Sequence, residues 1–171
     1  MTTVLLRAAV VPDVAAIAEF QTACWREAYR GLVPQEYLDR VGAAERAARW
    51  QKRLVSGARE VAVAVTGGEV GVGEQAGVGE QVVGVVSWGW PDPEARPALE
   101  LMSLYVGAGQ RGTGLAARLL EYAIGRESAY LWVFSGNQRA GAFYRKHGFR
   151  ADGGRATDPD TGLAEERFAR V

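Results

Sequence analysis

A glycine-rich loop in the second half of the chain has the composition of a phosphate-binding site. In the stretch LYVGAGQRGTGLAARLL, residues 104–120, Gly107, Gly109 and Gly112 form a G-x-G-x-x-G pattern between a strand-like run and a helix-like run. A helix that begins directly after such a loop presents unpaired backbone N–H groups and the positive end of its dipole to an anion. The pattern therefore predicts that this loop binds phosphate.

A Rossmann fold is one context for this pattern, but the neighbouring sequence argues against it. The dinucleotide fingerprint needs an acidic residue about 20 positions further on to hold the ribose. That position falls in YLWVFSGN, residues 130–137, which contains no carboxylate. The runs upstream of the loop have the pattern of antiparallel strands instead of parallel crossovers. A nucleotide-dependent oxidoreductase is therefore a distant alternative.

Shifted by two residues, the same loop reads Arg111-x-x-Gly114-x-Ala116. The small residues of this frame allow phosphate oxygens to approach the backbone N–H groups at the start of the helix, and Arg111 adds a positive charge. A plain tight turn is the alternative, but it does not explain why small residues continue into the helix. This frame predicts a pyrophosphate site from Arg111 to Ala116.

A second motif follows in the run LWVFSGNQRAGAFYRKHGF, residues 131–149, which reads as a strand, Asn137 and a helix that ends at Gly148. The two motifs, in this order, resemble the acyl-CoA loop and the second signature of the GCN5-related N-acetyltransferase (GNAT) family. The resemblance extends over essentially the whole chain and is to small bacterial members. It implies that acetyl-CoA is the co-substrate.

In this family two neighbouring parallel strands splay apart, and the pantetheine arm of the cofactor lies between them as an extra strand would. The resemblance places these strands at residues 98–106 and 129–134. A main-chain N–H on the first strand would polarise the thioester carbonyl. The residues expected to bind the cofactor are Leu104, Tyr105, Val106, Arg111, Gly112, Thr113, Gly114, Leu115, Ala116, Asn137, Ala140 and Phe143.

The resemblance also suggests two catalytic side chains. An alkylamine with a pKa near ~10.4 is almost entirely protonated at pH 7, so a base assists its attack. Glu100 begins the first splayed strand, where several relatives carry a glutamate that acts through water, and it is the candidate base; a solvated strand-end residue is the alternative. Tyr144 occupies the position of the acid that protonates the leaving thiolate, and a half-buried packing role is its alternative.

The run WREAYRGLVP, residues 25–34, corresponds by resemblance to one wall of the acceptor pocket. Trp25 and Tyr29 are spaced i,i+4 and share one helix face, while Arg26 and Arg30 share a different face. The aromatic pair would line the pocket or pack in the core. The arginine pair would bind a carboxylate of the acceptor. Spacing alone does not separate binding from packing.

The elements that must position these residues follow from apolar periodicity, which predicts the order β-α-α-β-β-β-α-β-α-β-β. Together with the resemblance, this order implies a single-domain GNAT-like α/β fold with a mixed sheet and helices on both faces. The expected strands are residues 3–10, 60–65, 81–90, 98–106, 129–134, 149–152 and 163–171, and the expected helices are 11–29, 34–56, 114–124 and 137–148.

The domain is expected to span residues 1–171, with a low-complexity β-hairpin connector at 66–81. This connector repeats GVGEQ at 71–75 and again at 77–81. Exposed hairpin tips tolerate such expansions, so we assign the repeat no chemistry.

Composition excludes several other classes of function. The 20 basic and 20 acidic residues cancel, so no global charge favours a nucleic-acid or membrane partner. The single cysteine, Cys24, and the single histidine, His147, make a metal site or a disulfide unexpected and fit a reducing compartment. The first residues lack a secretory h-region, and no stretch has the length of a membrane span. We therefore expect a cytoplasmic protein.

The sequence thus predicts an enzyme that moves an acetyl group from acetyl-CoA to a primary amine by direct attack in a ternary complex. A small amine or an amino acid is the favoured acceptor, and an aminoglycoside, a protein N-terminus or a lysine are alternatives. A non-catalytic acyl-CoA-binding sensor is the alternative outside the enzymes. A homodimer is left open.

Overall fold

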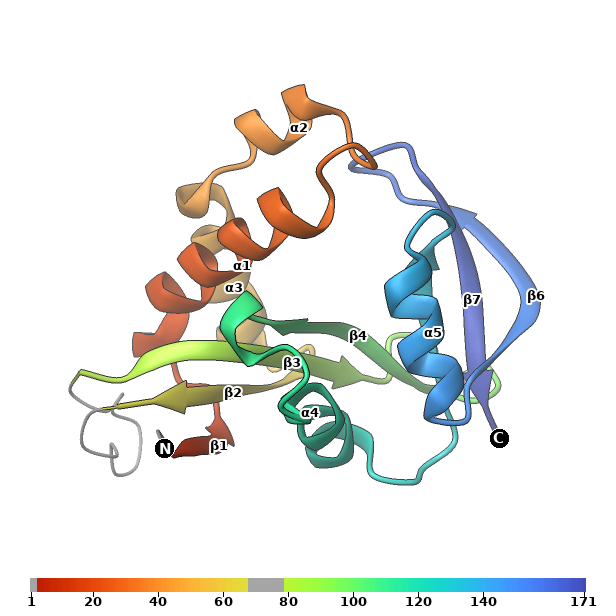
Figure 1. The fold of residues 1–171 in the computed structure, drawn as a ribbon. Coiled ribbons are helices and arrows are strands. Elements are labelled where there is room, and N and C mark those ends of the chain that lie inside the picture. The colour runs from red at the N-terminus through yellow and green to blue at the C-terminus, as the bar shows by residue number, and fades with distance from the viewer. Residues whose placement is uncertain (1–2, 68–78) are drawn as a thin grey trace.

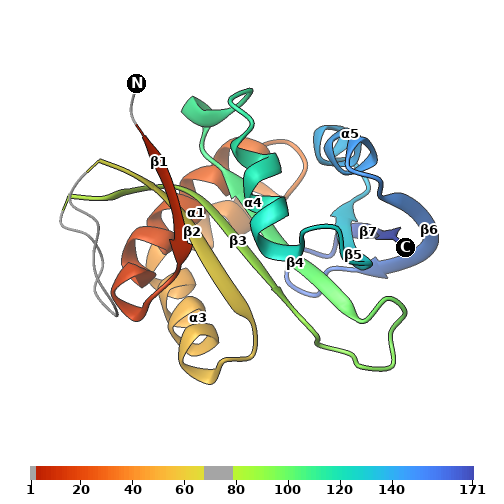
Figure 2. The same ribbon diagram turned by 90° about the horizontal axis from the view of Figure 1, so that it is seen from below.

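A computed structural model describes residues 3–67 and 79–171 of the chain. This part forms a seven-stranded sheet with helices on both of its faces (Figures 1 and 2). Residues 68–78, which hold most of the predicted connector, lie outside the described residues. The interpretation of the GVGEQ repeat therefore stays a prediction.

The sheet has the strand order β1-β2-β3-β4-β5-β7-β6. Its neighbouring strands are antiparallel except for β4 and β5, which are parallel. The strands are β1 Val4–Ala8, β2 Glu60–Thr66, β3 Gln81–Gly89, β4 Leu99–Val106, β5 Ala129–Phe134, β6 Arg150–Thr157 and β7 Ala164–Arg170. The predicted mixed sheet is confirmed.

The helices follow the predicted order with one addition. They are α1 Val14–Ala28, α2 Gln35–Arg40, α3 Ala43–Ser56, α4 Leu115–Ile124 and α5 Gln138–Lys146, with short 3-10 turns at Val11–Asp13 and Ala108–Gln110. The single helix expected over residues 34–56 is wrong, because the chain leaves the helical conformation at Val41, whose ψ is 86°, and resumes it after Gly42. The break is not visible in the sequence because apolar residues occur on both sides of it. Those of α2, together with Val41, form a small cluster of their own.

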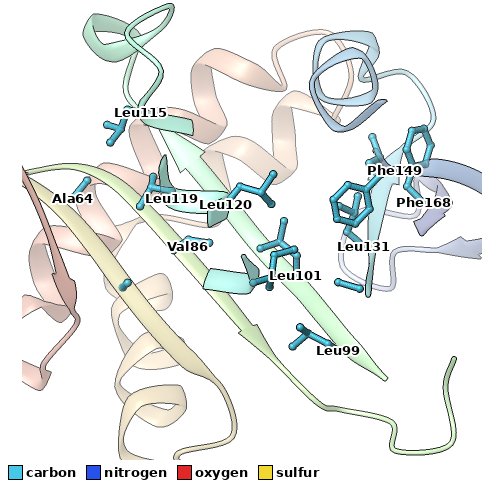
Figure 3. Packing of buried hydrophobic residues seen from close by; sticks show 14 residues of the cluster. Ala64, Val86, Leu99, Leu101, Leu115, Leu119, Leu120, Leu131, Phe149 and Phe168 are labelled. Atoms are coloured by element: carbon cyan, nitrogen blue, oxygen red, sulfur yellow. The ribbon is translucent and has the colours of Figure 1, made fainter. Parts of the chain in front are cut away.

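Strand β2 is buried on both faces, and its side chains alternate in size between them. Val61, Val63 and Val65 pack against α1 and α3, whereas Ala62 and Ala64 pack on the face covered by α4. Helix α4 lies close to this second face, where a Cβ atom at Gly84 would stand 2.8 Å from Leu119 Cδ1. Figure 3 shows the side chains of this α4 face. Small residues on the strands therefore fix the position of the helix that follows the glycine loop.

The sheet divides between β4 and β5. Their parallel pairing is recorded only for Leu99 with Ala129 and for Glu100 with Tyr130. Just beyond this point β4 contains a bulge, because Leu101 and Ser103 pair with the adjacent β3 residues Trp88 and Ser87. Figure 1 shows the two parts of the sheet, β1–β4 and β5–β7, diverging from this region. The expected splayed strands are thus present as β4 and β5.

Candidate active site

A cleft of about 670 Å³ lies along the divergence of β4 and β5. This volume is within the range of small-molecule and cofactor sites. Its walls come from β4, β5, α1, α3, the glycine loop, the first turn of α4, α5 and the segment that leads into β7. Every predicted cofactor-binding residue except Thr113 lines it.

The glycine loop forms one end of the cleft. Gly112 and Gly114 have φ angles of +77° and +86°, which L-amino acids with side chains rarely adopt, and no atom lies within 4 Å of where their Cβ atoms would be. The first i,i−4 hydrogen bond of α4 runs from the backbone N–H of Arg118 to the carbonyl oxygen of Gly114, at 3.1 Å. The backbone N–H groups of the three residues that begin the helix therefore have no partner within it. The loop is thus an open cradle of N–H donors that fits a pyrophosphate.

Arg111, the charged residue of this loop, is already engaged. Its Nη1 lies 2.6 Å from Glu27 Oε1 of α1. Both side chains are partly exposed, at 35% and 47%. An incoming phosphate would therefore compete with Glu27 for Arg111.

The edges of β4 and β5 that face each other form the middle of the cleft. Residues 101–106 of β4 and 131–134 of β5 all line it. The recorded pairing between the two strands stops before these residues, so their facing main-chain groups can pair with an extended ligand.

Helix α5 presents the second motif to the cleft. Asn137 Oδ1 accepts a hydrogen bond from the N–H of Ala140 at 3.1 Å, so this side chain caps the helix, and it also forms a side-chain hydrogen bond with Tyr29 of the cleft wall. Ala140, Phe143 and Tyr144 line the cleft from the same helix. Burial, with a further contribution from Tyr105, raises the pKa of Tyr144 above its ordinary value. The phenol therefore stays protonated at neutral pH and can donate a proton.

Glu100 lies at the last recorded pair of β4 and β5. Its Oε2 accepts a hydrogen bond from the Tyr130 hydroxyl at 2.9 Å. Burial raises the pKa of Glu100, while the Tyr130 hydrogen bond and the charge of Arg59 oppose that rise. Glu100 is not among the residues that line the cleft. A proton would therefore have to reach it through water.

Glu165 is a second carboxylate in the same region, and it does line the cleft. Burial raises its pKa, and the nearby Asp158 and Glu100 add to the rise. Glu165 pairs with Phe134 at the far end of β5, whereas Glu100 pairs with Tyr130 where the strands separate. The two carboxylates therefore lie at different positions along β5, and the raised pKa of each makes it a candidate to accept a proton.

The predicted acceptor wall is only partly present. Trp25 and Tyr29 line the cleft, their ring centroids are 4.6 Å apart, and Trp25 Nε1 donates to the Tyr105 hydroxyl at 3.0 Å. Arg26 and Arg30 are exposed and do not line the cleft. The i,i+4 spacing separated the two faces of α1 correctly, and the aromatic face is the one that meets the cleft.

Five other arginines line the cleft, and the sequence analysis did not identify them as site residues; one of them, Arg139, lies on α5. Arg46, Arg49 and Arg53 come from α3, and Arg59 comes from the turn before β2. The spacing of the three helical arginines is a signal that the sequence contains, because residues at i, i+3 and i+7 share one helix face. Arg59 has no such signal, since only the fold brings it beside this helix.

Comparison with known proteins gives the class of this site. The chain matches the family model for the acetyltransferase (GNAT) family over residues 16–149. The chain therefore belongs to this family, which confirms the predicted resemblance. No curated protein sequence matches the chain.

Solved structures share its fold at low sequence identity. The PaiA N-acetyltransferase from Thermoplasma acidophilum, in complex with coenzyme A, is 18% identical with a TM-score of 0.69, and 98% of each chain is covered. A GNAT-family acetyltransferase from Streptococcus pneumoniae is 19% identical with a TM-score of 0.61, again with 98% of each chain covered. The yncA protein from Salmonella typhimurium, with its cofactor acetyl-CoA, is 21% identical with a TM-score of 0.62, covering 98% of this chain and 92% of that one. These structures confirm the predicted α/β fold.

In residues 3–67 and 79–171, no cluster of three or more His, Cys, Asp and Glu side chains has the arrangement of a metal site. None of the helices in the same ranges has the length and apolar character needed to cross a bilayer.

Proposed function

We propose that the protein transfers the acetyl group of acetyl-CoA to a primary amine by direct attack in a ternary complex. The observation that carries this proposal is that one cleft contains the N–H cradle of the glycine loop, the unpaired edges of β4 and β5, and the phenol of Tyr144. Coenzyme A and acetyl-CoA are bound in two of the similar structures, which supports the same cofactor here. When bound, acetyl-CoA supplies an acetyl thioester that is reactive toward amines.

The cofactor would be held along the length of the cleft. Backbone N–H groups from Arg111 to Ala116 would bind the pyrophosphate, and main-chain groups of Leu104 to Val106 would pair with the pantetheine arm. The amide of Asn137 would donate to the same arm. A main-chain N–H of β4 would polarise the thioester carbonyl.

The protons would move at two named groups. Glu100 would accept a proton from the acceptor's ammonium group through water, which leaves the neutral amine to attack the thioester carbonyl, and its raised pKa makes it a stronger base than an ordinary carboxylate. Tyr144 would donate its phenolic proton to the departing thiolate, because its raised pKa keeps it protonated. The roles of both residues are proposals that rest on placement in and beside the cleft.

Direct attack is favoured over a covalent acetyl-cysteine. Cys24, the single cysteine, lines the cleft. Burial, with a contribution from Glu27, raises the pKa of its thiol to about 11. A thiol with this pKa is almost entirely protonated at pH 7 and is a weak nucleophile.

A small molecule is the proposed acceptor, because the acceptor side is a cleft lined by aromatic and charged side chains. A cytoplasmic location and the absence of nucleic-acid and membrane partners complete the proposal, and they rest on the balanced charge and the single cysteine. The assembly state is open between a monomer and a homodimer.

The test is release of free coenzyme A thiol over a panel of amines, with cofactor binding measured in parallel. The panel contains small amines, amino acids, an aminoglycoside and peptides with a free N-terminus or lysine. We expect acetyl-CoA, and not NADH, to raise the melting temperature, and at least one amine to accelerate thiol release. Binding of acetyl-CoA without amine-dependent release would favour the sensor, and stabilisation by NADH alone would favour the oxidoreductase.

A further inference from the structure

The wall of the cleft formed by α3 and the turn before β2 carries a concentration of positive charge. Arg46, Arg49, Arg53 and Arg59 all line it. Arg49 is neutralised locally, because it forms ion pairs with Glu45 and with Asp160. Within residues 3–67 and 79–171, the other three form no ion pair. We call Arg46, Arg53 and Arg59 the arginine wall.

The arginine wall is partly buried and incompletely hydrogen-bonded: Arg46 is buried, and Arg53 and Arg59 are half-buried. Arg46 is only 4% exposed. The Nε atoms of Arg46 and Arg59 are buried and have no hydrogen-bond partner in the described part of the chain. Buried donors are nearly always satisfied, and a buried cation is stable only when an anion or hydrogen-bond acceptors surround it. The Nε atoms are out of reach of a ligand, but both residues line the cleft without an anionic partner among the described residues, so their terminal N–H groups are the ones that an anion in the cleft would meet.

Aromatic rings hold two of these guanidinium groups in place. The Arg46 guanidinium lies over the Trp25 ring at 4.7 Å from its centroid, and that of Arg53 lies over Trp50 at 4.9 Å. Stacking of this kind orients the planar group and leaves its N–H edges free for a carboxylate or a phosphate. The wall therefore has the preorganisation of a binding site.

The pKa shifts of Arg53 and Arg59 are those expected of positive charges with too little negative charge beside them. Burial lowers the pKa of Arg53, and the neighbouring Arg59, Arg49 and Arg46 contribute to the lowering. Burial also lowers the pKa of Arg59, and Glu100 is the carboxylate that opposes this effect. Arginine remains protonated at neutral pH in spite of such effects, so an anion is the group that would relieve them.

One member of the arginine wall, Arg59, lies far from the phosphate cradle along β4. Arg59 lies beside Gly89, which pairs with Glu100 at the start of β4. The glycine loop begins after Val106, at the other end of the same strand. At ~3.3 Å per residue, the six residues from Glu100 to Val106 span about 20 Å. Arg59 therefore lies at the end of β4 away from the pyrophosphate. Arg46, in contrast, stacks on Trp25, which donates to Tyr105 further along the same strand. The arginine wall thus extends along the cleft from the Glu100 end of β4.

A negatively charged region lies within the same cleft. Asp158 and Glu165 line it, and neither forms an ion pair in the described ranges. Carboxylates attract an ammonium group, whereas the arginine wall attracts an anion. The two regions together match a molecule that carries both charges.

We propose that the acceptor is a primary amine that also carries a carboxylate or a phosphate, and that the arginine wall binds this anionic group. The proposal deepens the acetyltransferase function and rests on it. It assigns recognition of the acceptor's anionic group to residues of α3 and the turn before β2. The sequence analysis had assigned this role to Arg26 and Arg30, which are exposed.

The experiment compares amines that differ only in the anionic group. β-Alanine is paired with β-alaninamide, and O-phosphoethanolamine with ethanolamine. We expect kcat/KM to be about 10- to 100-fold higher for the anionic member of at least one pair, the usual effect of hydrogen bonds to a charged group. The carboxylate and phosphate pairs separate the two sources of negative charge.

Variants of the arginine wall make the comparison specific. Arg53→Gln and Arg59→Gln should each remove most of this preference, measured as the ratio of kcat/KM between the anionic and the neutral member of a pair. The ratio is the readout because Arg59 also acts on the pKa of Glu100, so its loss is expected to change kcat/KM for both members. Lys52→Gln, an exposed position on the same helix, is the matched control and should keep the preference. Melting temperature and acetyl-CoA affinity show that each variant is folded.

The outcomes distinguish the proposal of an anionic acceptor from the acetyltransferase function on which it rests. If amines are acetylated but the neutral members react as well as the anionic ones, the anionic acceptor is refuted and the acetyltransferase stands. If the preference exists and survives in both arginine variants, the assignment to the arginine wall is refuted. If no amine accelerates thiol release although acetyl-CoA binds, both proposals fail together.

Discussion

Glu100 and Tyr130 mark the point where the sheet opens. They are the last recorded pair of the parallel strands β4 and β5, and the Tyr130 hydroxyl donates to Glu100 Oε2 at 2.9 Å. The hydrogen bond favours the ionised form of Glu100, whereas burial favours the neutral form and raises its pKa overall. A carboxylate with these opposing influences beside the cleft is a candidate for proton transfer near neutral pH.

Replacing Glu100 with Gln tests this role. If Glu100 is the base, kcat/KM falls most at neutral pH and progressively less as the pH approaches the pKa of the amine, because solvent then supplies the neutral nucleophile. The measurement is a pH–rate profile for wild type and variant, with acetyl-CoA affinity determined separately. Glu165→Gln is the comparison variant, since Glu165 lines the cleft itself.

Tyr130→Phe gives an independent check of the same assignment. Loss of its hydrogen bond removes a stabiliser of the carboxylate and raises the pKa of Glu100 further. The acidic limb of the profile should therefore move upward by about one pH unit. A profile for Glu100→Gln that stays parallel to wild type, with the Glu165→Gln profile altered instead, would assign the base to Glu165.

Tyr144→Phe should lower kcat by roughly 10²–10⁴ and leave acetyl-CoA affinity within a few-fold, because a positioned proton donor is lost from the cleft. The measurement is single-turnover acetylation, which reports chemistry instead of product release. Tyr122→Phe is the matched control, since Tyr122 is 45% exposed and does not line the cleft. A Tyr144→Phe enzyme with wild-type single-turnover rate would remove this residue from the mechanism.

Gly114→Val should abolish acetyl-CoA binding for two reasons. The side chain would enter the open cradle, and a β-branched residue at φ of +86° strains the loop by ~1–2 kcal/mol. Calorimetric titration with acetyl-CoA measures the loss. Gly109→Ala is the control, because Gly109 belongs to the G-x-G-x-x-G frame, lacks a positive φ and also has open space around it. Equal loss in both variants would favour the frame that begins at Gly107.

Glu27→Gln should tighten acetyl-CoA binding by about two- to fivefold, the usual effect of a partly exposed ion pair. The reason is that Glu27 occupies Arg111, at 2.6 Å, and competes with phosphate for it. The gain should shrink at high salt, because salt screens exposed charges. Glu19→Gln, an exposed position on the same helix, should not change the affinity. Weaker binding in Glu27→Gln would show that the ion pair supports the loop.

Local motifs account for the parts of the site that the sequence made predictable. The glycine loop and the Asn137 motif each combine a strand end, a turn and a helix start, and residues close in sequence determine such structures. The position of Trp25 and Tyr29 followed from i,i+4 spacing, although the choice between core and cleft required the fold.

Long-range packing accounts for the parts that were not predictable. Arg59 meets the α3 arginines only because β2 returns beside that helix. The break at Val41 was hidden because the apolar residues on either side of it serve two different clusters. Glu100 was placed correctly at the splay point, but its absence from the cleft wall depends on side-chain packing.

The most direct test of the central claim is an initial-velocity study with acetyl-CoA and the best amine of the panel, with the acetylated amine and the free thiol quantified together. Direct transfer in a ternary complex predicts intersecting double-reciprocal lines and one acetylated amine for each thiol released. Parallel lines would indicate a covalent acetyl-enzyme. Thiol release that does not depend on the amine would contradict acetyl transfer itself.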